Sequence, residues 1–160
     1  MLWGVEVRSQ VPSSAADPGT VFHPISPTRA YDSRLEAFVP NGMRLNNSSR
    51  VIDVSAGHDL TTGDITATDV VPVGAAAITY NLTSVDSTPN GFVAVTCGDA
   101  ATYATSTLNL SGTPLANGGT VAIAADRSIK VRIGGGGATQ VIIDVTGYYA
   151  PPGPVPNMAG

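Results

Sequence analysis

The chain is poor in charge, and this shortage excludes two classes of partner. Only 12% of its 160 residues are charged, about half of the ~25% that is usual in globular proteins. The formal net charge is -4, and Lys130 is the only lysine. Nucleic acids and anionic membranes both attract a basic surface, which exchanges counterions from their phosphates. We therefore expect neither nucleic acid nor membrane as a partner.

Cysteine and long apolar runs are also scarce. Cys97 is the only cysteine, so stability must come from packing without an internal disulfide, and we expect this thiol to be a small buried side chain. No run approaches the ~18 apolar residues of a membrane-spanning helix. The N-terminus lacks the basic and apolar regions of a signal peptide, which is typical of a cytoplasmic product; a mature fragment with an added Met is the alternative.

Residues for catalysis or metal binding are few. The only histidines, His23 and His58, lie in no known catalytic motif, and a zinc site needs three or four suitably spaced ligands. Asp59, Asp64 and Asp69 offer oxygen atoms that calcium prefers, but their spacing matches no known calcium loop and favours a solvated loop. We expect no catalytic residue, metal or cofactor, and hence no enzyme.

What the sequence does contain is a series of short strand-like runs. Ile78, Tyr80 and Leu82 alternate with Thr79, Asn81 and Thr83, the period of two expected of a half-buried strand. In the same way, Ile129, Val131 and Ile133 should point inward, and Lys130 and Arg132 outward. The predicted strands are 21–25, at a sheet edge because of two prolines, then 50–54, 76–83, 91–97 (covered on both sides), 105–110, 120–124, 128–133 and 141–149.

Turn sequences separate these runs and define the fold class. They include Asn90-Gly91, Asn117-Gly118-Gly119 and the four glycines of 134–137, which indicate a flexible hairpin tip. Short strands at this spacing predict an all-β chain, a single β-sandwich of jelly-roll or Ig-like type with about eight strands. Residues 35–49 and 55–70 should be long polar connections.

Two arms should flank the sandwich, which we place at residues 21–149. Residues 1–20 form the N-terminal arm, and the proline-rich residues 150–160 form an extended C-terminal tail. Trp3, the only tryptophan, lies on the first arm and needs a surface to bury it. That surface can belong to its own domain or to a neighbouring subunit.

Tyr148 and Tyr149 are the second candidate interface. Neighbouring residues on a strand point to opposite faces, so these two rings cannot both face the core. One of them should be exposed or lie at an interface.

Four charged residues form the most interesting polar group. Arg29, Asp32 and Arg34 lie close together in sequence, and Asp144 interrupts an apolar strand. A buried carboxylate needs partners, and charge-assisted hydrogen bonds among these groups can close a corner of the fold. The sequence favours a structural role, with ligand binding and catalysis as the alternatives.

At these residues the chain resembles a β-domain found in small virion proteins of actinobacterial tailed phages. The resemblance covers about residues 21–149 and is carried by motifs in one order: PTRAYDSR (27–34), VPVGAAAITYNLT (71–83), GFVAV (91–95), STLNL (106–110), ANGGTVA (116–122) and VIIDVTGYY (141–149). Cell-surface proteins of actinobacteria contain a related pattern, whose first motif tends to read RLLDTR. The form AYDSR and the single domain resemble the phage proteins more closely.

The resemblance implies a non-enzymatic component on the exterior of the virion, which is made in the host cytoplasm. It implies a capsid decoration protein that docks on the major capsid protein or other virion proteins, as a trimer or dimer, and stabilises the shell. The alternatives are a minor tail protein or a module that binds a host surface glycan. For glycan binding, the candidate aromatic residues are Tyr103, Tyr148 and Tyr149.

Overall fold

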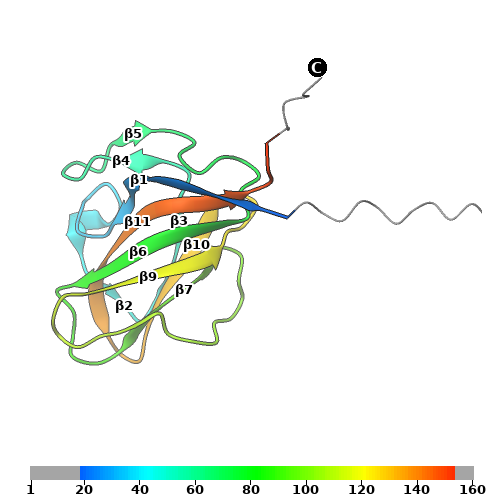
Figure 1. Cartoon of the computed structure of the whole chain (residues 1–160). Coiled ribbons are helices and arrows are strands. Elements are labelled where there is room, and N and C mark those ends of the chain that lie inside the picture. The colour runs from blue at the N-terminus through cyan, green and yellow to red at the C-terminus, as the bar shows by residue number, and fades with distance from the viewer. Residues whose placement is uncertain (1–18, 154–160) are drawn as a thin grey trace, which may run out of the picture.

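The computed structural model describes residues 19–153, which form two antiparallel β-sheets packed face to face (Figure 1). The prediction of an all-β sandwich is therefore confirmed. Within the described residues, no helix is long and apolar enough to cross a membrane.

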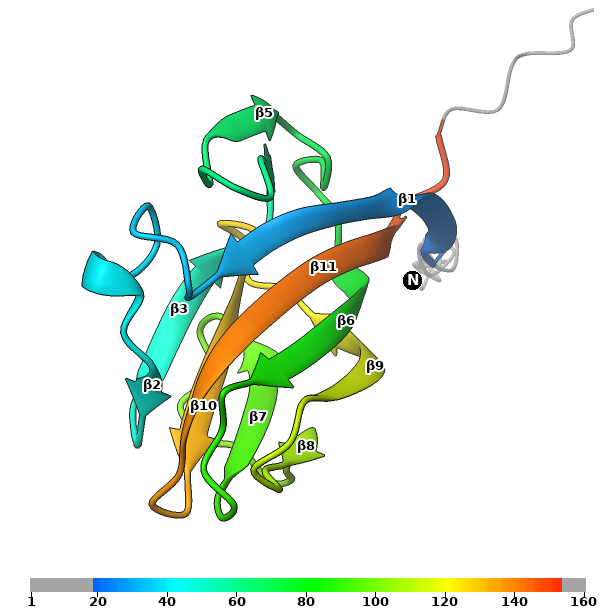
Figure 2. The same ribbon diagram turned by 90° about the vertical axis from the view of Figure 1, so that its left-hand side faces the viewer.

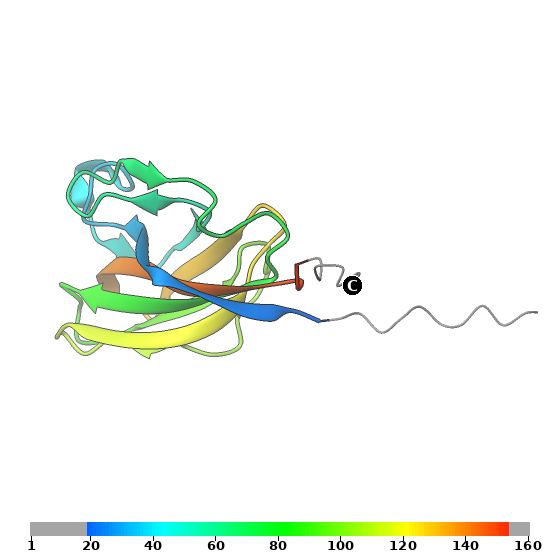
Figure 3. The same cartoon turned by 45° about the horizontal axis from the view of Figure 1, so that its top comes forward.

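Each sheet has a simple strand order (Figures 1 and 2). The first sheet runs in the order β1 (Val21–Asp32), β11 (Ala138–Ala150), β6 (Ala77–Val85) and β9 (Leu115–Ala122), with β2 (Leu45–Asn46) paired to β11. The second runs in the order β3 (Ser49–Asp53), β10 (Ser128–Gly134), β7 (Phe92–Cys97) and β8 (Leu108–Asn109). A separate hairpin, β4 (Gly57–His58) and β5 (Ile65–Ala67), lies beside β1 (Figure 3), and one 3-10 turn spans Pro40–Gly42.

The core lies between the sheets and follows the predicted alternation. Ile78 and Leu82 of β6 are fully buried, while Thr79, Asn81 and Thr83 point outward and are half-buried. On β10, the three branched side chains at 129, 131 and 133 are fully buried, and the two cations point outward. Burial of each such side chain contributes about 1.5 to 3 kcal/mol, so this alternation fixes the faces of both sheets.

The structure contains more strands than the predicted eight or so. The additional ones are β2, β4 and β5, in the stretches predicted as polar connections, and each has only two or three residues. Runs this short cannot show a period of two. The edge strand was predicted to end at residue 25, but β1 continues to Asp32 because irregular pairing with β11 between Pro24 and Thr28 accommodates the prolines.

The prediction of a turn at Asn117-Gly118-Gly119 is wrong, because this sequence lies in the middle of β9. Gly119 is paired with Tyr80, and a Cβ at Gly119 would lie 2.6 Å from the Tyr80 hydroxyl oxygen. The glycine therefore makes room for a core tyrosine on the neighbouring strand.

The prediction of a hairpin at residues 134–137 is also wrong. Strands β10 and β11 pair with different partners and lie in different sheets, so the glycines connect the two layers. The chain turns sharply here, and Gly135 and Gly136 have positive φ angles of 68° and 74°.

Strands β7 and β8 differ from the prediction in detail. Val93 on the inner face of β7 and Ala94 on its outer face are both buried, as expected of a strand covered on both sides, but Cys97 is only half-buried. The strand predicted at 105–110 is reduced to Leu108–Asn109. Just before it, the side chain of Thr107 accepts a hydrogen bond from the backbone amide of Val95.

Both ends of the sandwich leave it at one corner. Val21 at the start of β1 is paired with Ala150 at the end of β11, so the two flanking segments start side by side (Figure 1). Trp3 and residues 154–160 lie outside the described residues.

Candidate functional site

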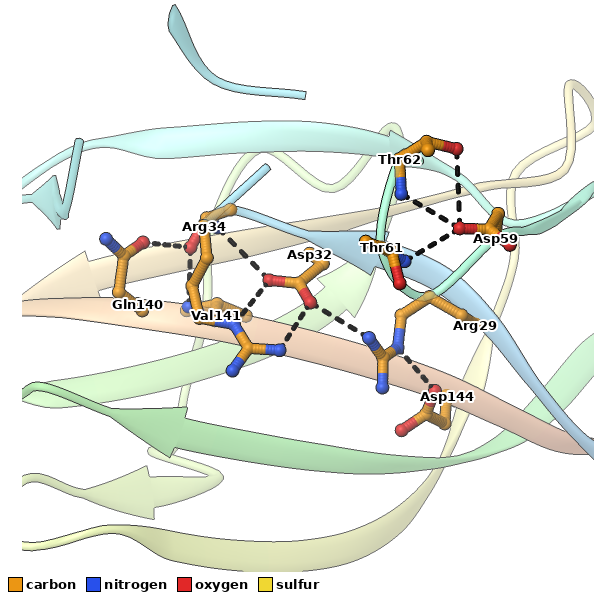
Figure 4. Close-up of polar contacts among 10 residues, drawn as sticks. Arg29, Asp32, Arg34, Asp59, Thr61, Thr62, Gln140, Val141 and Asp144 are labelled. Carbon is orange, nitrogen blue, oxygen red and sulfur yellow. Dashed lines mark hydrogen bonds and ion pairs between the residues drawn. The ribbon is translucent and has the colours of Figure 1, made fainter. Parts of the chain in front are cut away.

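The four residues of the predicted polar cluster lie together where β1 ends against β11 (Figure 4). The Asp32 carboxylate is fully buried. Its Oδ1 accepts hydrogen bonds from the Arg34 backbone amide at 3.1 Å and from Arg34 Nε at 2.9 Å. Its Oδ2 accepts from Arg29 Nη1 at 2.9 Å and Arg34 Nη2 at 2.7 Å. Each carboxylate oxygen therefore has two donors.

Arg29 joins the cluster to the middle of the sheet. Its Nε donates to Asp144 Oδ1 at 2.7 Å, and the two residues are directly opposite in the pairing of β1 with β11. Asp144 neutralises a guanidinium that is itself 12% exposed. The cluster thus couples two strands through a chain of alternating charges.

The charges of the cluster fix the protonation of Asp32. Burial raises the pKa of this carboxyl, but hydrogen bonds from Arg34 and the positive charges of Arg34 and Arg29 outweigh burial and leave the pKa below its ordinary value. The same hydrogen bonds raise the pKa of Arg34. Asp32 is therefore an ionised acceptor whose oxygens are engaged, which suits a structural tie and not proton transfer.

Two neutral residues extend the cluster, and sequence reasoning missed both. Ser33 Oγ donates to Gln140 Oε1 at 2.6 Å and accepts from the Val141 amide at 2.8 Å. Gln140 Nε2 donates to the Gly42 carbonyl at 2.6 Å. The only feature of the sequence that could have identified these two residues is their position: Ser33 lies inside the motif PTRAYDSR, and Gln140 directly precedes the motif VIIDVTGYY.

Gly42 completes this corner. Its φ angle is 56°, and a Cβ there would lie 2.3 Å from the Arg34 carbonyl oxygen. The turn after β1 can therefore fold back onto Arg34 only with glycine at this position.

The tyrosine pair follows the predicted alternation of faces. Tyr148 and Tyr149 point to opposite faces and both are half-buried, so the exposure expected as one outcome is not seen, and a place at an interface stays a prediction. His23 stacks on Tyr148 with centroids 4.9 Å apart, and Phe22 covers Tyr149 at 5.2 Å. Residues of β1 thus shield both rings at the corner where the two flanking segments leave the sandwich.

The remaining candidates for chemistry do not converge. His58 Nδ1 lies 2.8 Å from the Gly63 carbonyl oxygen, far along the chain from His23 and on a different sheet. Asp59 Oδ1 accepts from the amides of Thr61 and Thr62 and so closes its own turn (Figure 4). Residues 19–153 contain no group of three or more His, Cys, Asp or Glu that could hold a metal ion.

The outer faces of the two sheets differ in charge. Strands β6 and β9 of the first sheet contain no Asp, Glu, Lys or Arg. The second sheet presents Lys130 and Arg132 of β10 on its outer face. The β6–β9 half of the first face is therefore suited to close packing, whereas the β1–β11 half of that face contains the ion pair of Arg29 and Asp144. The second face is suited to binding a charged group.

Comparisons of the chain with protein-family models, with curated proteins and with solved structures found no match.

Proposed function

We propose that the chain is a non-enzymatic structural protein on the exterior of a tailed-phage particle, where it decorates the capsid and stabilises the shell. The observation that carries the proposal is the uncharged β6–β9 half of the outer face of the first sheet. The resemblance of the chain to small virion proteins supports the same role.

The outer face of β6 and β9 has the composition of a docking surface. It consists of small and neutral side chains: Ala77, Thr79, Asn81 and Thr83 of β6, and Ala116, Gly118, Thr120 and Ala122 of β9. Burying a charge costs much more than burying a methyl or a hydroxyl group that finds a partner, and interface cores are depleted in charged residues. A protein partner can therefore cover this face at little desolvation cost.

Strand β9 strengthens this argument because it is an edge strand without protection. It ends the strand order of the first sheet and has eight residues with neither charge nor proline. In proteins that remain monomeric, edge strands usually contain charged residues or proline, which prevent pairing with a strand of another chain. An unguarded edge suits a strand that a neighbour in an assembly extends.

The common exit corner supports attachment by both flanking segments. Val21 and Ala150 are paired, so residues 1–20 and 151–160 start from one place and can reach the same neighbour. On a lattice, many weak contacts of this kind combine into high avidity. A symmetric trimer or dimer of the chain would multiply them further.

A lysine placed on the docking face tests the proposal. Thr120→Lys puts a charge in the middle of exposed β9 without touching the core, and it should weaken binding to particles assembled without the protein at least tenfold, measured by co-sedimentation. Leu60→Lys is the matched control, because Leu60 is 63% exposed in the distant β4–β5 hairpin, and it should bind like the wild type. Equal binding by both variants would refute docking through this face.

A further inference from the structure

A hollow of about 470 Å³ lies on the outer face of the second sheet, away from the proposed docking face. Its floor is formed by Thr96 of β7 and by Lys130 and Arg132 of β10, with Ser49 of β3 at one side. Residues 100–103, in the connection between β7 and β8, form the other side. The volume falls within the range of ~300 to 1,000 Å³ that is typical of small-ligand pockets.

The hollow contains cations that no carboxylate neutralises. Among the cations of residues 19–153, Arg29, Arg34, Arg44 and Arg127 each form an ion pair with an aspartate. Lys130 and Arg132, like Arg50 outside the hollow, form none with any described residue. None of the described residues that line the hollow is acidic. In a chain with a net charge of -4, the hollow is a local concentration of positive charge.

The two cations are held in place but keep donors available. Lys130 Nζ donates to the Ala100 carbonyl at 2.6 Å, and Arg132 Nη1 donates to Ser49 Oγ at 3.3 Å. A lysine has three N–H donors and an arginine has five. The guanidinium of Arg132 therefore has donors beyond the one bound to Ser49, and its buried Nε has no hydrogen-bond partner among the described residues.

The other walls of the hollow fit a saccharide. Hydroxyl groups of Ser49, Thr96 and Thr102 can exchange hydrogen bonds with sugar hydroxyls. Tyr103 is 40% exposed at the rim and is held by Arg132, whose Cζ lies 5.0 Å from the ring centroid, and by Phe92 at 5.6 Å. An aromatic ring fixed in this way offers an apolar surface to the C–H face of a sugar.

We propose that this hollow binds a saccharide unit that bears one acidic group, with the acid on Lys130 and Arg132 and the ring beside Tyr103. Guanidinium groups pair well with carboxylate and with phosphate, so either acid satisfies the geometry. A bounded hollow favours a single sugar unit over an extended acidic peptide. The inference goes beyond the docking role proposed above and does not depend on it.

Titration of the full-length ¹⁵N-labelled chain, followed by NMR, tests the inference. The probes are D-glucuronate, D-glucose 6-phosphate, neutral D-glucose and a hexaglutamate peptide. We expect an acidic sugar to shift the amides of Thr96, Lys130 and residues 100–103, with a Kd of about 1 mM, and glucose to bind at least tenfold more weakly. Comparison of the two acidic sugars shows whether carboxylate or phosphate is preferred.

Variants locate the binding. Arg132→Gln and Lys130→Gln should each weaken it at least tenfold, and Ser49→Trp should abolish it by filling the hollow while keeping both cations. Arg44→Gln removes an equal charge from an exposed site paired with Asp86 and should bind like the wild type. A thermal unfolding curve for each variant separates loss of binding from loss of folding. Equal binding of glucose, equal weakening in Arg44→Gln, or binding of hexaglutamate alone would overturn the proposal.

Discussion

At the scale of single residues, Asp32 is the centre of the fold's polar corner. Its two oxygens accept hydrogen bonds from both Arg29 and Arg34, and no part of its side chain is exposed. Removing one member of a buried ion pair is costly because the other members keep uncompensated charge.

Asp32→Asn should lower the free energy of unfolding by about 3 to 5 kcal/mol, measured by urea denaturation. The matched control is Asp86→Asn, whose carboxylate is 70% exposed and lies 3.7 Å from Arg44. An exposed pair of this kind contributes less than about 1 kcal/mol. Similar losses in the two variants would show that the cluster is not a structural tie.

The low pKa of Asp32 also predicts a dependence on pH. Because the folded pKa lies below the unfolded value, the unfolded chain takes up the proton first as the pH falls. The stabilisation from Asp32 is complete at pH values above the ordinary pKa of an aspartate. It starts to decrease below about pH 4 and is gone once the pH falls below the pKa of Asp32 in the folded protein.

The difference in unfolding free energy between wild type and Asp32→Asn should therefore shrink between pH 6 and about pH 2. Urea unfolding of both proteins across this range measures it, and the comparison cancels contributions from other carboxyls such as Asp59, whose pKa is also lowered by hydrogen bonds from Thr62 and Thr61. A difference that stays constant down to the acid end would contradict the assigned role.

At the scale of elements, glycines show what the sequence pattern can and cannot reveal. The alternation of Ile78, Tyr80 and Leu82 identified β6 and its buried face, because burial imposes a period of two. Gly118 and Gly119 indicated a turn, whereas they lie inside β9. The packing of Tyr80 against the neighbouring strand explains Gly119, and that contact is not local in sequence.

Gly91 and Gly118 form a matched pair that tests the close approach of the backbone at the 134–137 connection. Gly91 has a φ angle of 104°, and a Cβ there would lie 2.6 Å from Gly137 Cα. Gly91→Ala should therefore cost about 1 to 3 kcal/mol of unfolding free energy, because backbone cannot move aside. Gly118→Ala should be neutral or slightly stabilising, since its nearest neighbour would be 3.7 Å away. The reverse order of stability would contradict the close approach of Gly91 to Gly137 and the open surroundings of Gly118.

The candidate site was predictable only in part, because some of its contacts are not local in sequence. Arg29, Asp32 and Arg34 are close in sequence, and Asp144 is conspicuous in an apolar strand, so their types alone indicated pairing. Ser33 and Gln140 are ordinary polar residues that meet only because β1 ends against β11. Likewise, the hollow around Arg132 depends on how residues 100–103 lie against the second sheet, and no local sequence pattern predicts their position.

At the scale of the whole molecule, the sandwich and the flanking segments should be separable. Strand β1 begins at Val21, and the first described residue that packs against the core is Ile25. Deleting residues 1–18 should change the unfolding free energy by less than about 0.5 kcal/mol but abolish incorporation into particles. Normal incorporation of the truncated chain, scored by quantitative blotting of purified particles, would refute the anchoring role of this segment and of Trp3.

The proposed location of the chain is the exterior of a tailed-phage particle. Immunogold electron microscopy of purified particles, with an antibody to this protein, tests it most directly. We predict label spread over the heads, since the uncharged outer face of β6 and β9 and the paired starts of the flanking segments fit a repeating shell. Label confined to tails would correct the location to a tail component, and particles without any label would contradict the account.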